Sequence, residues 1–139
     1  MRRTLLVSAA LLAGSAAAAR AQGGAVKASD VAGTWDTKAS VGPKDSVVVT
    51  SVITVSADGK SWTMKYPNRD PMAVRVVAMA GDSVVTETGP YPSMLRAGQT
   101  VTVLHSVGHY KGDKMWGTFD AHYSSGDVVH GKETGTRKM

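Results

Sequence analysis

Four histidines carry the side chains best suited to chemistry, and all lie in the last third of the chain: His105, His109, His122 and His130. An imidazole can bind a divalent metal or exchange protons near neutral pH, especially beside a carboxylate. The chemistry open to these histidines therefore depends on which carboxylates the neighbouring strands bring to the same face.

Two turns decide which residues share a face with His105. The tight turn in KGDK places His105 opposite Asp120 and brings His122 to the same face. The next turn, in SSGD, is expected to place Glu133 opposite Thr118 and to add it to the cluster. His105, Asp120 and His122 then form a candidate site for Zn²⁺ or another divalent metal, or an acid–base pair.

The alternative is that this face is an outer wall of solvated polar residues, and the sequence favours it. An inward cluster of charges would need full pairing, and a change of register by one residue would disperse it. The opposite face makes the better core, although Lys132 falls on it in the expected register. Its apolar members are Leu104, Tyr110, Met115, Phe119, Ala121 and Tyr123.

Sequence motifs for catalysis are lacking: the chain contains no G-x-S-x-G, H-E-x-x-H, P-loop or G-x-G-x-x-G pattern. The sequence therefore predicts a protein that is not an enzyme and that holds no cofactor, unless the histidine face binds a metal.

The first 21 residues have the pattern of a cleaved signal peptide. Arg2 and Arg3 precede an apolar run, Thr4–Gly14, which is too short to span a bilayer. Ala19-Arg20-Ala21 is an A-x-A site, so we expect cleavage before Gln22 and a periplasmic or secreted protein. No second apolar run of membrane length follows, and we expect no membrane span after cleavage.

Removal of 21 residues from 139 leaves 118, which suits one domain with one core. Three of the 16 basic residues leave with the signal, so 13 basic residues remain against 11 acidic ones. The charges form no basic stripe, which argues against nucleic acid as a partner. We expect a flexible leader over residues 22–30 and a single monomeric domain over residues 31–139.

The remaining chain alternates extended runs with turn signals and shows no long helical period. A helical turn is expected only near PSMLRAG. The eight predicted strands are residues 34–40, 46–56, 61–66, 72–79, 83–88, 100–110, 114–124 and 128–138.

Two kinds of turn alternate along this series of strands. ADGK, AGDS and KGDK are tight hairpin turns, whereas the remaining connections are longer loops or contain proline. In an up-and-down meander alternate turns lie at opposite ends, so the tight turns form a closed base and the longer loops an open mouth. Closure into an eight-stranded antiparallel barrel removes both bare edges, and a two-sheet β-sandwich is the alternative.

The first strand begins at the base with Gly33-Thr34-Trp35, and the last strand ends there with Arg137. Alternation points Trp35 inward, and Gly33 lets the chain turn beneath the barrel. If the first and last strands pair, the Arg137 guanidinium lies beside the Trp35 indole, an attraction of about 0.5 to 2 kcal/mol. These three residues, Gly33, Trp35 and Arg137, are expected to be structural.

The G-x-W pattern at the first strand together with the late Arg137 resembles the lipocalin-like proteins of the calycin superfamily, in the form of a compact exported bacterial barrel. The resemblance implies an eight-stranded barrel whose mouth admits a small hydrophobic ligand. The sequence departs from the full lipocalin pattern in three respects. It has no T-D-x motif, it shows no C-terminal helix, and the chain is short.

We therefore expect binding of a small hydrophobic or amphipathic molecule at the open end of the barrel. One alternative is a filled barrel that acts as an interaction module in the cell envelope. A weaker alternative is the divalent-metal site on the histidine face. Methionine and tyrosine give soft apolar contact and a polar rim, although both also serve as ordinary core residues. The residues expected to bind the ligand are Met64, Tyr66, Tyr91, Met94, Leu95 and Tyr123.

Overall fold

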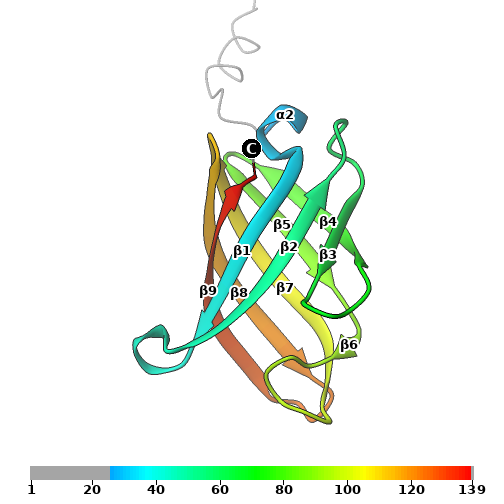
Figure 1. Ribbon diagram of the computed structural model, residues 1–139, viewed down its shortest axis with the longest axis vertical. Coiled ribbons are helices and arrows are strands. Elements are labelled where there is room, and N and C mark those ends of the chain that lie inside the picture. The colour runs from blue at the N-terminus through cyan, green and yellow to red at the C-terminus, as the bar shows by residue number, and fades with distance from the viewer. Residues whose placement is uncertain (1–25, 139) are drawn as a thin grey trace, which may run out of the picture.

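The computed structural model describes residues 26–138 as one closed, twisted β-barrel with a short helix over one end (Figure 1). The predicted signal peptide lies outside these residues. The helical elements are α2 (Ala28–Val31) and the 3-10 turn η1 (Pro43–Asp45). The strands are β1 (Gly33–Val41), β2 (Val47–Val55), β3 (Trp62–Lys65), β4 (Met72–Ala80), β5 (Ser83–Thr88), β6 (Tyr91–Pro92), β7 (Thr100–Lys111), β8 (Lys114–Tyr123) and β9 (Val128–Arg137).

Eight of these strands form the wall, each antiparallel to the next along the chain. Pairing of β1 with β9 joins the ends of the meander, and pairing of β5 with β7 completes the ring. The two-residue β6 pairs with β7 at the mouth and lies outside this ring. The predicted all-β, eight-stranded up-and-down barrel is therefore confirmed, and the sandwich alternative is wrong.

All eight predicted wall strands are present, with ends within one residue of those expected. The predicted helical turn in PSMLRAG is wrong, since residues 93–99 form only bends and turns. A helical turn occurs instead at η1, inside the loop between β1 and β2. No helix among residues 26–138 is long and apolar enough to cross a membrane.

Helix α2 closes the base of the barrel. Ala28 to Asp30, which belong to the segment predicted as a flexible leader, form its first turn. Val31 at its end is fully buried, and the Trp35 indole Nε1–H donates to the Val31 carbonyl at 2.9 Å. An apolar residue just ahead of the first strand thus fixes the helix to the core.

The interior contains two apolar clusters, one toward each end. The base cluster consists of Val31, Val55, Trp62 and Val84. The mouth cluster consists of Met64, Tyr66, Tyr91, Val101, Ala121 and Tyr123.

Candidate ligand-binding site

An internal cavity of about 70 Å³ lies inside the barrel. It is lined from the base, at Trp62 and Tyr110, to the mouth, at Met94 and Leu95. A single water needs about 10–15 Å³ on this scale, and pockets for drug-sized ligands measure about 300–1,000 Å³. The cavity is therefore suited to a few waters or to one very small organic molecule.

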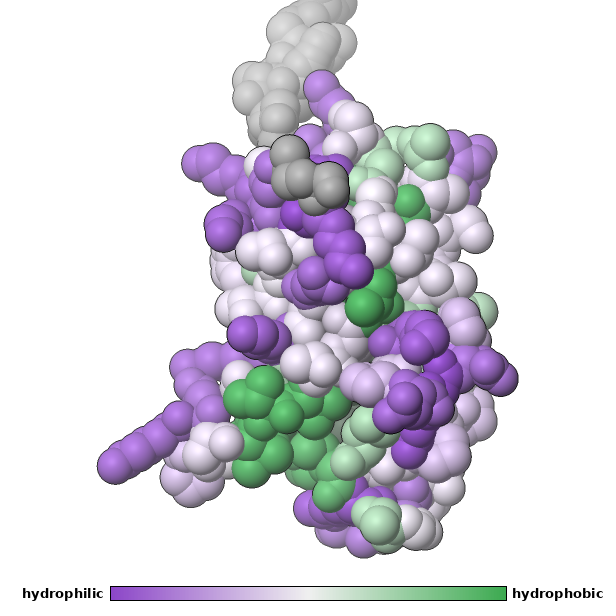
Figure 2. Space-filling view, viewed as in Figure 1, coloured by the Kyte–Doolittle hydropathy of each residue, from purple (hydrophilic) through white to green (hydrophobic). Residues whose placement is uncertain are grey.

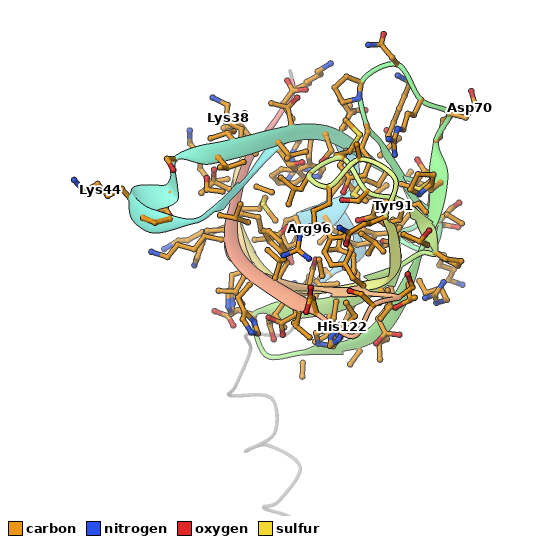
Figure 3. All side chains as sticks on the ribbon, turned by 90° about the horizontal axis from the view of Figure 1, so that it is seen from below. Lys38, Lys44, Asp70, Tyr91, Arg96 and His122 are labelled. Carbon is orange, nitrogen blue, oxygen red and sulfur yellow. The ribbon has the colours of Figure 1, made fainter. Side chains whose placement is uncertain are left out.

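The six residues predicted to contact a ligand all line this cavity: Met64, Tyr66, Tyr91, Met94, Leu95 and Tyr123. Seen from the mouth, Tyr91 and Arg96 lie within the ring of strands, whereas Lys44 points away on the β1–β2 hairpin (Figure 3). The fold thus places all six residues around one space.

Tyrosine hydroxyls at the mouth are paired with one another and with serine. The hydroxyls of Tyr66 and Tyr91 lie 3.0 Å apart, and those of Ser93 and Tyr123 lie 2.7 Å apart. Burial raises the pKa of both Tyr66 and Tyr91, so these side chains stay neutral at physiological pH. Arg96 stacks on the Tyr123 ring at 4.7 Å and bridges to Asp127 at 3.0 Å, which orders the loop over the mouth.

At the base, Tyr110 stands between two tryptophans. Its ring meets the Trp35 ring edge-on, with centroids 5.0 Å apart, and the Trp62 ring at 6.2 Å. Burial raises the pKa of Tyr110 well above its usual value. Such aromatic pairs add about 0.5 to 1.5 kcal/mol each beyond the burial of their area, so the floor of the cavity is rigid.

The predicted register between the last two strands is wrong by one residue. Glu133 lies opposite Gly117, and Lys132 lies opposite Thr118. The turn between β8 and β9 takes up one more residue than expected, with Gly126 in the left-handed region at φ 100°. Because side chains alternate along a strand, this slip turns Glu133 toward the cavity and Lys132 toward solvent.

Glu133 is an acidic residue inside an otherwise largely apolar wall. Burial raises the pKa of its carboxyl group to about 7, and no nearby donor or cation lowers it again. Its negative charge raises the pKa of both Tyr66 and Tyr110, which places it within electrostatic reach of both ends of the cavity. The Glu133 side chain is partly buried, and among residues 26–138 desolvation is the one influence on its pKa, with no donor or cation opposing it.

The inner face of β9 leaves room for this side chain because the residues on either side of it are glycines. A Cβ at Gly131 would lie 2.5 Å from the Ser40 carbonyl oxygen and would also collide with the Phe119 ring. A Cβ at Gly135 would lie 2.9 Å from Met115 Cγ. Phe119 and Met115 thus fill the spaces over the two glycines, and Glu133 projects between them.

The histidine cluster faces outward, as the solvated alternative had it. His105 lies opposite Asp120 and Val103 opposite His122, in the register expected for this hairpin. However, His105 Nδ1 lies 3.2 Å from Glu87 on β5, and Asp120 pairs with His130 on β9. In the part of the chain that the structure describes, no three His, Cys, Asp or Glu side chains are arranged to hold a metal ion.

Two strand irregularities affect residues near the cavity wall. Val101 is buried because β7 and β8 change register between Val101 and Val103. Met79 lies opposite the buried Val84 near the end of β4, beyond a register shift between Val76 and Ala78, and is 40% exposed.

The residues expected to be structural meet at the base. The Arg137 guanidinium carbon lies 4.6 Å from the centroid of the Trp35 ring. Gly33 has φ 117°, and a Cβ there would lie 3.4 Å from Arg137 Cδ. These contacts, together with the Trp35–Val31 hydrogen bond, cover the base of the barrel.

A larger hollow, of about 720 Å³, opens to solvent across β1, β2 and β9 and shares Thr37, Ser51, Tyr66 and Met115 with the internal cavity. Its lining is mostly polar or charged, with Lys38, Lys65 and Lys114 among its members. Because it is open to solvent, it offers no desolvated surface for a small apolar molecule. The internal cavity is therefore the better candidate site.

No protein-family model, no curated protein and no solved structure matches this chain. The case for a function therefore depends on the barrel and on the residues inside it.

Proposed function

We propose that this chain is an exported, lipocalin-like protein that holds one small amphipathic molecule inside the barrel. The observation that carries the proposal is the internal cavity, lined by apolar side chains from the floor to the mouth, with the Glu133 carboxyl group among them. Burial of apolar surface would drive entry, and the polar groups would orient the molecule.

The G-x-W pattern and the Arg137–Trp35 contact support the likeness to lipocalins, because both stand at a covered base opposite an open mouth. The volume of about 70 Å³ limits the proposal to occupants of a few non-hydrogen atoms unless the mouth loops move.

The proposal is tested by native mass spectrometry of the exported protein, followed by methyl NMR titration with small alcohols and amines. We expect either a small organic adduct that denaturation removes or shifts of the Met64, Met94 and Met115 methyl signals on titration. Ala39→Leu, which adds bulk at a cavity-lining residue, should abolish both signals. Ala80→Leu, on the exposed end of β4, is the matched control and should leave them unchanged.

A second candidate function is contact with another protein of the cell envelope. Val47 and Val48 are 45% and 51% exposed on the β1–β2 hairpin, where an apolar patch is visible (Figure 2). Val48→Ser would weaken such a contact and leave binding inside the barrel intact. Retention of all ligand signals together with loss of a cross-linked partner would favour this second function.

A further inference from the structure

We propose that Glu133 makes the cavity selective for a small organic cation, of the alkylammonium class, over uncharged molecules of the same size. This inference rests on the proposed function, since it names the chemical class of the molecule inside the barrel. It adds a role for the one acidic side chain that lines the cavity.

The position of Glu133 supports this selectivity. Its neighbours on the inner face of β9 are Gly131 and Gly135, and the residue opposite it on β8 is Gly117. None of these can donate a side-chain hydrogen bond to the carboxylate. A partly buried carboxylate without a protein donor is costly, and a bound ammonium group would supply both the donors and the opposite charge.

Within residues 26–138, no cation of the protein already fills this role. Lys38 on β1 is the only cationic residue among those that line the cavity, and its side chain points away from the barrel axis (Figure 3). From the other elements packed against the cavity, the titratable groups are the tyrosines Tyr66, Tyr91, Tyr110 and Tyr123. The charge of Glu133 is thus left for a ligand to neutralise.

The apolar surroundings restrict the rest of the ligand. Phe119 and Met115 flank Glu133, and Ala39 lies opposite it on β1. A short alkyl chain fits these contacts, whereas a second charged group would have no partner. The volume of about 70 Å³ favours a molecule as small as n-butylammonium, which we choose as the probe.

Ionisation of the Glu133 carboxyl group should also make the affinity for the cation depend on pH. With a carboxyl pKa of about 7, the ionised fraction falls about tenfold between pH 8 and pH 6. The amine stays protonated over this range, so its affinity should fall by about the same factor on acidification. An uncharged molecule should show no such loss.

The test is methyl NMR titration of the exported protein with n-butylammonium and with 1-butanol, which have the same number of non-hydrogen atoms. At pH 8 we expect the cation to bind at least tenfold more tightly than the alcohol. Glu133→Gln should remove the preference, whereas the matched control Glu87→Gln, on the outer wall, should retain it. As a second measurement, saturation with the cation should lower the pKa of Glu133 by one unit or more in a carboxyl-detected titration.

Two outcomes would overturn the inference in different ways. Equal binding of cation and alcohol, unchanged by Glu133→Gln, would remove the selectivity and leave the proposed function standing. If neither probe shifts the methyl signals of the cavity, both the proposed function and the inference are contradicted.

Discussion

The Arg137 guanidinium lies over the Trp35 indole at 4.6 Å, and this contact joins the last strand of the barrel to the first. The same guanidinium bridges to Asp113 at 3.1 Å and donates to the carbonyl oxygens of Ala32, Asp30 and Gly112. One side chain therefore ties together α2, β1, β9 and the turn between β7 and β8.

Substitution Arg137→Met, which retains most of the apolar stem, is expected to lower the free energy of unfolding by about 2 to 4 kcal/mol. It removes the cation–π contact and leaves carbonyl groups without their charged donor. Urea unfolding measures the change, with Lys132→Met as the control because Lys132 is 72% exposed. Equal stability of the two variants would show that the Arg137 contacts contribute nothing net.

Substitution Val31→Ala should destabilise the protein by about 2 kcal/mol, because it removes two methyl groups from a fully buried site beneath the barrel. Val48→Ala makes the same chemical change at a side chain that is 51% exposed and should cost less than about 0.5 kcal/mol. Thermal or urea unfolding of the pair gives the comparison. A small effect at Val31 would mean that α2 is not part of the cooperative fold.

Stability should fall as the pH rises from about 4.5 through 7. The folded-state pKa of Glu133 lies near 7, above the value of an exposed glutamate, so the folded protein binds this proton more tightly than the unfolded chain. The contribution is complete below pH 4.5 and is lost above pH 7, with a total on the order of 3 kcal/mol.

Glu133→Gln should therefore match the parent protein near pH 4.5 and exceed its stability at pH 8. Urea unfolding at several pH values measures the free energy of unfolding of both proteins. The difference between the two values cancels the titration of the other groups. Glu87→Gln on the outer wall is the control. A difference that does not change with pH would place the Glu133 carboxylate in contact with water or a cation.

Substitution Gly131→Ala should cost more than about 2 kcal/mol, because the added methyl group would enter space held by Phe119 and the Ser40 carbonyl. Phe119→Leu in the same chain should recover part of the loss, so the double variant should be less destabilised than the sum of the two. Lys132→Ala, one residue away and exposed, is the control for strand propensity. If the double variant is destabilised by the full sum of the two single variants, the proposed collision is contradicted.

The barrel was predictable because its signals are local and agree with one another. Each wall strand is bounded by turn residues, and tight turns alternate with longer loops, so the strand ends and the direction of the meander follow from short stretches of sequence. The inward Trp35 and the pairing of β1 with β9 follow from the same alternation.

The orientation of Glu133 was not predictable from these signals, because it depends on the length of a single turn. One residue more in the loop that contains Gly126 reverses the inner and outer faces of β9. A signal was nevertheless present in the strand itself: Gly131 and Gly135 alternate with Glu133, which leaves large side chains of β8 a place to pack. Helix α2 was missed because four residues carry too little helical pattern to stand out.

The pairing of β1 with β9 also has a consequence for the order of folding. Each hairpin from β1 to β5 joins neighbours in the sequence, whereas the contact of Trp35 with Arg137 brings together residues at the two ends of the chain. Such a contact closes one of the longest loops within residues 26–138, so its loop-closure entropy is large and it forms after the local hairpins. The ring cannot close until β9 is in place, and until then β1 remains an open edge.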